Sequence, residues 1–144
     1  MRKPRPKLEY SPRLTSAPHN GPLSDVCVML VEDEHTLAVV LLDYLEDLGA
    51  QIVGPIDTVA EGLSVVANQK FDVAILDVNL GGERTYAIAD ELRKRAIPFI
   101  FLTGYASWAA PDYHDVPVLQ KPFDQETLLP TLASLLGRTD LSAR

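Results

Sequence analysis

Five short apolar runs in this chain alternate with stretches whose apolar residues recur at helical spacing. Each run is too short to span a membrane and is bounded by polar residues, glycine or proline, which is typical of buried strands. The predicted strands are Val26–Val31, Ala50–Ile56, Phe71–Asp77, Ile97–Leu102 and Val116–Leu119.

Four helices are predicted between and after these strands. Gly49 supplies the stop signal of the first, and the Thr58-x-x-Glu61 capping box starts the second. Pro130 lies in the last leucine stripe, where a missing N–H should kink the helix or mark a restart. The helical patterns cover Leu37–Leu48, a stretch from Thr58, Thr85–Ala96 and Leu128–Leu136, with a short piece at Tyr105–Ala110.

Strands that alternate with helices predict an α/β fold with a doubly wound, five-stranded parallel sheet covered by helices on both faces. In the flavodoxin-like strand order 2-1-3-4-5, ligands bind at the carboxyl ends of the first and third strands. The residues that end these strands are therefore the candidates for a functional site.

Composition divides the chain of 144 residues into a folded body and a basic arm. Residues 1–24 contain five prolines and five basic residues against one acidic residue, which predicts a disordered arm with a charge of +4. The folded domain is expected at residues 25–137 and a tail at residues 138–144. The rest of the chain then carries −11, which argues against direct nucleic-acid binding.

The sequence also bears on location and assembly. No secretory segment and no membrane span is seen, and the lone Cys27 fits a reducing cytoplasm. A monomer or weak dimer is expected.

Polar residues close four of the five predicted strands. Glu32 and Asp33 follow the first, Asp77 ends the third, Thr103 follows the fourth and Lys121 follows the fifth. The carboxyl ends of parallel strands share one edge, so these side chains are expected to meet there. Three clustered carboxylates favour a hard divalent ion such as Mg²⁺, and an ammonium and a hydroxyl suit phosphoryl oxygens. These are the parts needed for phosphoryl transfer to a carboxylate.

The segments VEDE (31–34), LDVN (76–79), Thr103-Gly104 and Lys121-Pro122 together resemble the receiver domain of bacterial response regulators, over roughly residues 25–137. The resemblance implies that Asp77 accepts a phosphoryl group from a kinase histidine. It also implies that Asp33, Asp77 and the Asn79 carbonyl hold Mg²⁺, with Glu32 assisting. Thr103 and Lys121 would grip the phosphoryl oxygens. Phe101-x-Thr-Gly-Tyr105 further resembles the "FAT GUY" subgroup of stand-alone receivers, often paired with HWE or HisKA2 kinases.

Two departures from the receiver pattern concern signal output. Val118 stands where receivers usually carry an aromatic switch residue, and Gly81-Gly82 replace the usual proline and Asp-Gly after the phosphoacceptor. The switch is therefore assigned to Thr103, Gly104 and Tyr105, which would shift the chain through Trp108.

The expected partners are a sensor histidine kinase or phosphotransfer protein and a downstream protein, and the chain is not expected to be an enzyme beyond its own phosphorylation and dephosphorylation. Two alternatives within the family are a phosphate sink and an interaction module without phosphotransfer. Outside it stand an FMN carrier, which lacks a phosphate-cradling loop here, and an aspartyl-phosphate hydrolase, which would need a second Asp where Asn79 stands.

Overall fold

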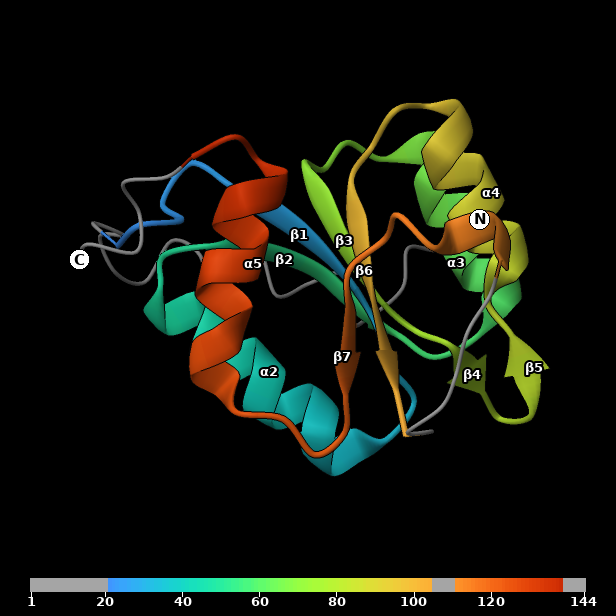
Figure 1. Cartoon of the computed structure of the whole chain (residues 1–144), viewed down its shortest axis with the longest axis horizontal. Helices are drawn as coiled ribbons and strands as arrows, with labels where there is room; N and C mark the ends of the chain where they lie inside the picture. Colours follow the sequence, from blue (N-terminus) through green and yellow to red (C-terminus); the bar gives the residue numbers. More distant parts are fainter. Residues whose placement is uncertain (1–20, 105–110, 139–144) are drawn as a thin grey trace, which may run out of the picture.

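The computed structural model describes residues 21–104 and 111–138, and it contains the predicted parallel sheet. The strand order is β2-β1-β3-β6-β7, with every neighbouring pair parallel, which confirms the predicted order 2-1-3-4-5 (Figure 1). The strands are β1 (Cys27–Val31), β2 (Gln51–Ile56), β3 (Val73–Asp77), β6 (Phe99–Thr103) and β7 (Val118–Gln120). No helix in the described ranges is long and apolar enough to cross a membrane.

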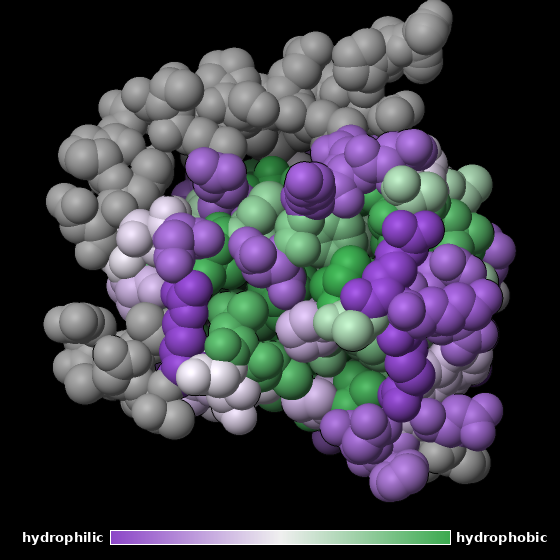
Figure 2. Space-filling model, turned by 90° about the horizontal axis from the view of Figure 1, so that it is seen from above, coloured by the Kyte–Doolittle hydropathy of each residue, from purple (hydrophilic) through white to green (hydrophobic). Residues whose placement is uncertain are grey.

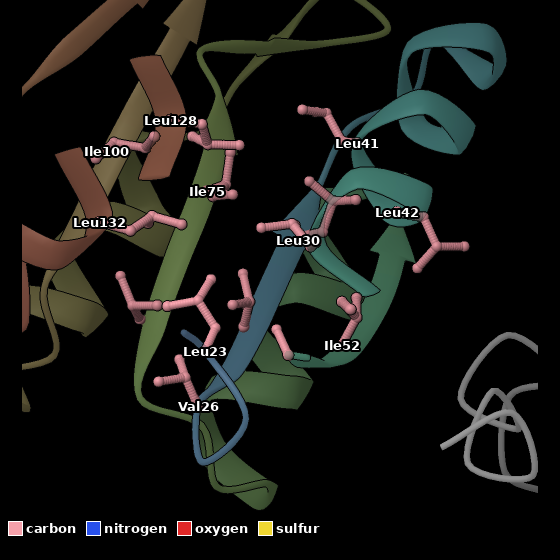
Figure 3. Close-up of a cluster of buried hydrophobic side chains, with 14 of the residues drawn as sticks. Leu23, Val26, Leu30, Leu41, Leu42, Ile52, Ile75, Ile100, Leu128 and Leu132 are labelled. Carbon is pink, nitrogen blue, oxygen red and sulfur yellow. The ribbon is translucent and has the colours of Figure 1, made fainter. Parts of the chain in front are cut away.

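Helices cover both faces of this sheet. The helices are α2 (His35–Asp47), α3 (Val59–Asn68), α4 (Tyr86–Lys94) and α5 (Leu128–Leu135). Leucines of α2 and α5 pack with one cluster of strand residues, whereas α3 and α4 pack with the other (Figure 3 shows the first cluster). Neighbouring residues of β1 divide between the clusters, with Leu30 in the first and Val31 in the second, as a strand buried on both faces requires.

Two of the prolines inside predicted elements, Pro55 and Pro130, lie where a missing N–H is tolerated. Pro55 lies in β2, an edge strand whose register with β1 shifts between Met29 and Val31. Pro130 is the third residue of α5, in the first turn, where backbone N–H groups have no intrahelical acceptor. A 3₁₀ turn at Gln125–Thr127 precedes α5, so Pro130 accompanies a restart of the helix and not a kink.

The folded body begins earlier and ends later than the sequence predicted. Leu23, which had been placed in the arm, is fully buried in the core, and its N–H donates to the Leu48 carbonyl at 2.8 Å. Arg138, which had been placed in the tail, forms a bidentate ion pair with Asp25, in which the two guanidinium nitrogens donate to the two carboxylate oxygens at 2.7 and 2.8 Å. The predicted boundaries of the body at residues 25 and 137 are therefore too narrow. Residues 1–20 and 139–144 lie outside the described residues.

Candidate functional site

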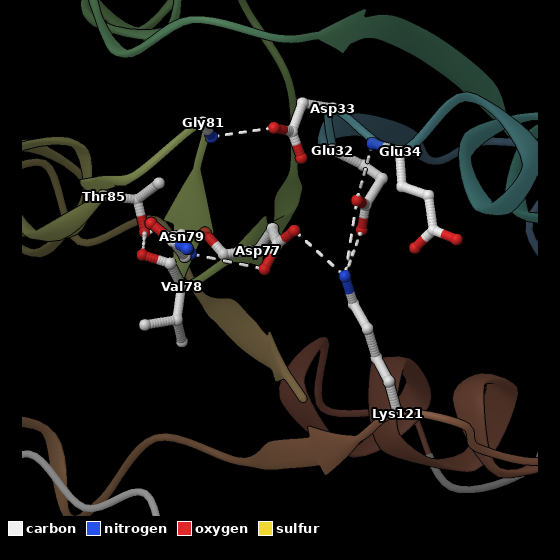
Figure 4. Close-up of polar contacts among 9 residues, drawn as sticks. All are labelled: Glu32, Asp33, Glu34, Asp77, Val78, Asn79, Gly81, Thr85 and Lys121. Atoms are coloured by element: carbon white, nitrogen blue, oxygen red, sulfur yellow. Dashed lines mark hydrogen bonds and ion pairs between the residues drawn. The ribbon is translucent and has the colours of Figure 1, made fainter. Parts of the chain in front are cut away.

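The carboxyl edge of the sheet gathers the polar residues that close the strands (Figure 4). Glu32 and Asp33 follow β1, and Asp77 is the last residue of the neighbouring strand β3. Oxygen atoms of these three carboxylates lie within 4.8 Å of one another. The predicted cluster is therefore present, with Glu32 and Asp77 buried and Asp33 exposed.

Lys121 links two of these carboxylates. Its Nζ lies 3.0 Å from Asp77 Oδ2 and 3.1 Å from Glu32 Oε1. The backbone N–H of Lys121 donates to the Thr103 carbonyl at 2.6 Å, so the backbone of Lys121 is held beside the end of β6. Burial lowers the pKa of Lys121, but hydrogen bonds and charge from Asp77 and Glu32 outweigh it, so the net pKa is raised. The ammonium is therefore held in its charged form beside Asp77.

Glu32 occupies the most buried position of the cluster. Burial raises its pKa to about 7, the nearby Asp77 charge adds to the rise, and the Glu34 N–H and Lys121 oppose it. Its Oε1 contacts the Lys121 ammonium as an ion pair but accepts no hydrogen bond within the described residues. Such an atom can accept from a metal-bound water without giving up an existing hydrogen bond.

Asp33 is positioned by a hairpin that the sequence did not predict. The strands β4 (Asn79–Leu80) and β5 (Glu83–Arg84) pair antiparallel across a Gly81-Gly82 turn. Gly81, with φ 54°, donates its N–H to Asp33 Oδ2 at 2.8 Å. The Gly-Gly pair was a usable hairpin signal, but two-residue strands are too short to show an alternating pattern.

The Asp77 side chain and its backbone carbonyl have separate partners. Oδ1 accepts from the Asn79 N–H at 3.3 Å, and the carbonyl oxygen accepts from the Thr85 hydroxyl at 2.7 Å. Thr85 was predicted only as the start of a helix, and nothing in the sequence pattern linked it to Asp77. It is a site residue that the sequence reasoning missed.

The donor set fits a divalent cation of the hard class. It offers carboxylate oxygens from three residues, with no sulfur or imidazole atom in the cluster that the described residues form. One of these oxygens, Glu32 Oε1, is buried and accepts no hydrogen bond from the described residues. The cluster therefore suits Mg²⁺ better than a soft transition metal.

The predicted switch residues are only partly described. Thr103 is buried at the end of β6 opposite Gln120, and Gly104 is exposed, with no atom within 4 Å of where a Cβ would stand. Tyr105 and Trp108 lie outside the described residues, so their predicted role stays a prediction. Val118 is 40% exposed and lies in an edge strand.

The opposite edge of the sheet offers apolar surface without comparable chemistry. A groove of about 370 Å³ lies at the amino ends of β6 and β7, and Figure 2 shows apolar side chains gathered on this end of the molecule. Among its lining residues are Pro98, Pro117 and Leu135, and its charged pair, Arg93 and Asp115, is already bonded at 3.1 Å. The candidate site for chemistry is therefore the carboxyl edge.

The burial of Glu32 predicts a pH dependence of stability in metal-free protein. Between about pH 4.5 and about pH 7 the folded chain keeps a proton on Glu32 that the unfolded chain has lost. The free energy of unfolding therefore falls as pH rises through this window. The free energy of unfolding should fall less over this window in Glu32→Gln than in the wild-type chain. Residue 32 no longer titrates in this variant, and the Lys121 charge stays constant.

Urea unfolding of both proteins in the presence of a chelator, from about pH 5 to about pH 8, tests this expectation. The difference between the two curves removes contributions from the histidines. Parallel curves would show that Glu32 titrates as an ordinary exposed carboxyl.

Known proteins share both the sequence and the fold of this chain. The family model for the response regulator receiver domain matches residues 28–133. The sensory transduction protein LytT of Bacillus anthracis is 32% identical over 110 residues, which cover 72% of this chain and 45% of LytT. The chain thus spans about half the length of the first curated relatives that it matches.

Solved structures agree with this result. The solution structure of SdrG from Sphingomonas melonis Fr1 matches with 43% identity and a TM-score of 0.70, over 81% of this chain and 98% of SdrG. SdrG has also been solved in a BeF3-activated conformation, and that structure matches with 45% identity and a TM-score of 0.66, over 76% of this chain and 95% of that one. The response regulator PhyR from Brucella abortus matches with 25% identity and a TM-score of 0.69, over 78% of this chain and 48% of PhyR. The sequence match and the strand-end geometry lead to one conclusion: this chain belongs to the response regulator receiver domain family.

Proposed function

We propose that this chain is a phosphoacceptor response regulator of a two-component phosphorelay, which receives a phosphoryl group on Asp77 from a phosphohistidine. The observation that carries this proposal is the Lys121 ammonium, which contacts both Asp77 and Glu32 at the carboxyl edge. An ammonium beside a nucleophilic carboxylate is suited to hold a phosphoryl oxygen as the new bond forms.

In the proposed step, an Asp77 carboxylate oxygen attacks phosphorus and forms the acyl phosphate. The bond between phosphorus and the donor imidazole nitrogen breaks, its electron pair stays on nitrogen, and the imidazole takes a proton from solvent. Lys121 moves its contact from the carboxylate to a phosphoryl oxygen, and the Thr103 hydroxyl donates to another. Asp77 Oδ2 lies 3.0 Å from Nζ before the reaction, so only a short movement is needed.

Asp33 and Asp77, with the backbone carbonyl of Asn79, would hold Mg²⁺, and Glu32 would accept from a metal-bound water. When bound, the ion neutralises negative charge on the phosphoryl oxygens. Gly81 keeps Asp33 directed toward the cluster through its 2.8 Å hydrogen bond. Without the ion, three carboxylates face a single lysine of this cluster, so divalent binding should relieve their repulsion.

The output proposed is a protein–protein contact made when Thr103 moves toward the phosphoryl group and carries Gly104 and Tyr105 with it. The phosphoryl donor would be a sensor histidine kinase or a phosphotransfer protein, and the product an altered surface for a downstream protein. Catalysis beyond the chain's own phosphorylation and dephosphorylation is not part of the proposal. A cytoplasmic location is part of the proposal, because Cys27 is a free, half-buried thiol whose pKa burial raises to about 11.

The test is phosphoryl uptake by the wild-type chain. Incubation with acetyl phosphate, or with phosphorylated histidine kinases of the source organism, should add one phosphoryl group by intact mass when Mg²⁺ is present. A chelator should abolish uptake. Uptake that persists in the chelator, or no uptake from any donor at millimolar Mg²⁺, would contradict the proposal and favour an interaction module.

A further inference from the structure

Three of the described helices have a threonine at the N-cap, and among these the Thr58 and Thr85 hydroxyls bind different kinds of partner. Thr58 precedes α3, and its Oγ1 accepts the Glu61 N–H at 3.1 Å, which is the usual capping bond. Thr85 precedes α4 but makes no side-chain cap bond. Its hydroxyl turns back to the end of β3, so helix capping does not explain it.

Thr85 instead binds the backbone beside Asp77 (Figure 4). The hydroxyl donates to the Asp77 carbonyl at 2.7 Å, with a longer contact of 3.3 Å to the Val78 carbonyl. The Thr85 N–H donates to the same Val78 oxygen at 3.0 Å. The two consecutive peptide groups that lead from Asp77 to Asn79 are thus both held by one fully buried residue.

These peptide groups carry atoms of the site. The peptide between Val78 and Asn79 presents the Asn79 N–H to Asp77 Oδ1 at 3.3 Å, and its oxygen is the one that Thr85 holds. The chain between Val78 and Thr85 is the β4–β5 hairpin, whose Gly81 N–H binds Asp33. Rotation of either peptide would therefore disturb two of the three carboxylates.

The geometry points to Thr85 as a positioning residue for the phosphoacceptor: its hydroxyl fixes the peptide groups on both sides of Val78, and through them the Asp77 carboxylate and the hairpin that holds Asp33. This role of Thr85 rests on the proposed function, and Thr85 itself would touch neither the phosphoryl group nor the ion. A buried donor or acceptor is costly to leave unpaired, so the hydrogen bonds of the Thr85 hydroxyl should restrict the orientation of both peptide groups.

The test compares substitutions that differ only in the hydroxyl. Thr85→Val keeps the shape and removes the donor, whereas Thr85→Ser keeps the donor. Thr58→Val is the matched control, since it removes a cap threonine that does not contact the site. If Thr85→Val does not fold, Thr85→Ala serves the same comparison with Thr85→Ser.

Thr85→Val should weaken Mg²⁺ affinity and slow phosphoryl uptake, each by about tenfold, as is typical for groups that orient metal ligands. It should also shift the Asn79 and Gly81 amide resonances in metal-free protein. Thr85→Ser should restore all three properties, and Thr58→Val should leave them unchanged although it lowers stability.

Wild-type affinity and rate in Thr85→Val would overturn the inference, as would equal defects in Thr85→Ser or in Thr58→Val. If the wild-type chain takes up no phosphoryl group, the proposed function fails. The Mg²⁺ titration and the metal-free amide shifts would still test Thr85 in that case, so the two failures are distinguishable.

Discussion

The Asp77→Asn variant is expected to take up no phosphoryl group under conditions that fully label the wild-type chain. The substitution keeps the size and shape of the side chain but replaces the nucleophilic carboxylate oxygen with an amide. Lys121 keeps its contact with Glu32 at 3.1 Å, so the site should stay assembled. Intact-mass measurement after incubation with acetyl phosphate and Mg²⁺ records the result.

Asp47→Asn is the control, because Asp47 is an exposed carboxylate at the end of α2, away from the cluster. It should label like the wild-type chain. Full labelling of Asp77→Asn would mean that another carboxylate is the acceptor, and cooperative thermal unfolding of the variant excludes misfolding as the cause of lost labelling.

Removal of the Lys121 charge is expected to give the largest loss of stability at the site. Lys121→Met leaves Glu32 and Asp77 without the ammonium that contacts them, while the Asp33 carboxylate stays nearby. We expect a fall of about 2 kcal/mol in the free energy of unfolding in metal-free buffer, less than for a fully buried ion pair because the lysine side chain is 20% exposed. Mg²⁺ should restore more stability to this variant than it adds to the wild-type chain, because no ammonium competes for the carboxylates.

Lys94→Met provides the comparison for this effect. Lys94 pairs with Glu91 at 3.1 Å on the surface of α4, where its side chain is 71% exposed. Exposed pairs contribute about 0–1 kcal/mol, so the loss should be small and independent of Mg²⁺. Urea unfolding of both variants with and without Mg²⁺ measures the difference. Equal losses in the two variants would show that the Lys121 contacts stabilise the fold no more than an exposed ion pair does.

The sheet and the acidic cluster could be predicted because each depends on a regular pattern. The apolar runs of β1, β3 and β6 are buried on both faces, so they stand out from the helical stretches. The strand ends of a parallel sheet lie at one edge whatever the loops do, and that alone brought Glu32, Asp77 and Lys121 together. The topology of the sheet was therefore enough to predict that these residues lie close together.

Features that depend on single contacts could not be predicted in this way. Leu23 is one apolar residue among prolines, and only the packed core shows that it is buried. Thr58 carries a capping-box signal because Glu61 follows it, but no sequence pattern connects Thr85 with the Asp77 carbonyl that its hydroxyl binds. Tyr113, which stacks on Tyr86 and donates to Asp90, comes from a segment without helical or strand periodicity. None of these contacts follows from a helical or strand periodicity in the sequence.

The Asp25–Arg138 ion pair holds the two ends of the folded body next to each other. It joins the stretch before β1 to the residue just after α5, at 2.7 and 2.8 Å. The two positions are 113 residues apart in sequence but adjacent in space. A short linker across this corner would allow circular permutation, with new ends opened at the exposed turn near Lys70 between α3 and β3. The contacts at the carboxyl edge should all remain in the permuted chain, because this turn precedes the amino end of β3, whereas Asp77 is at its carboxyl end.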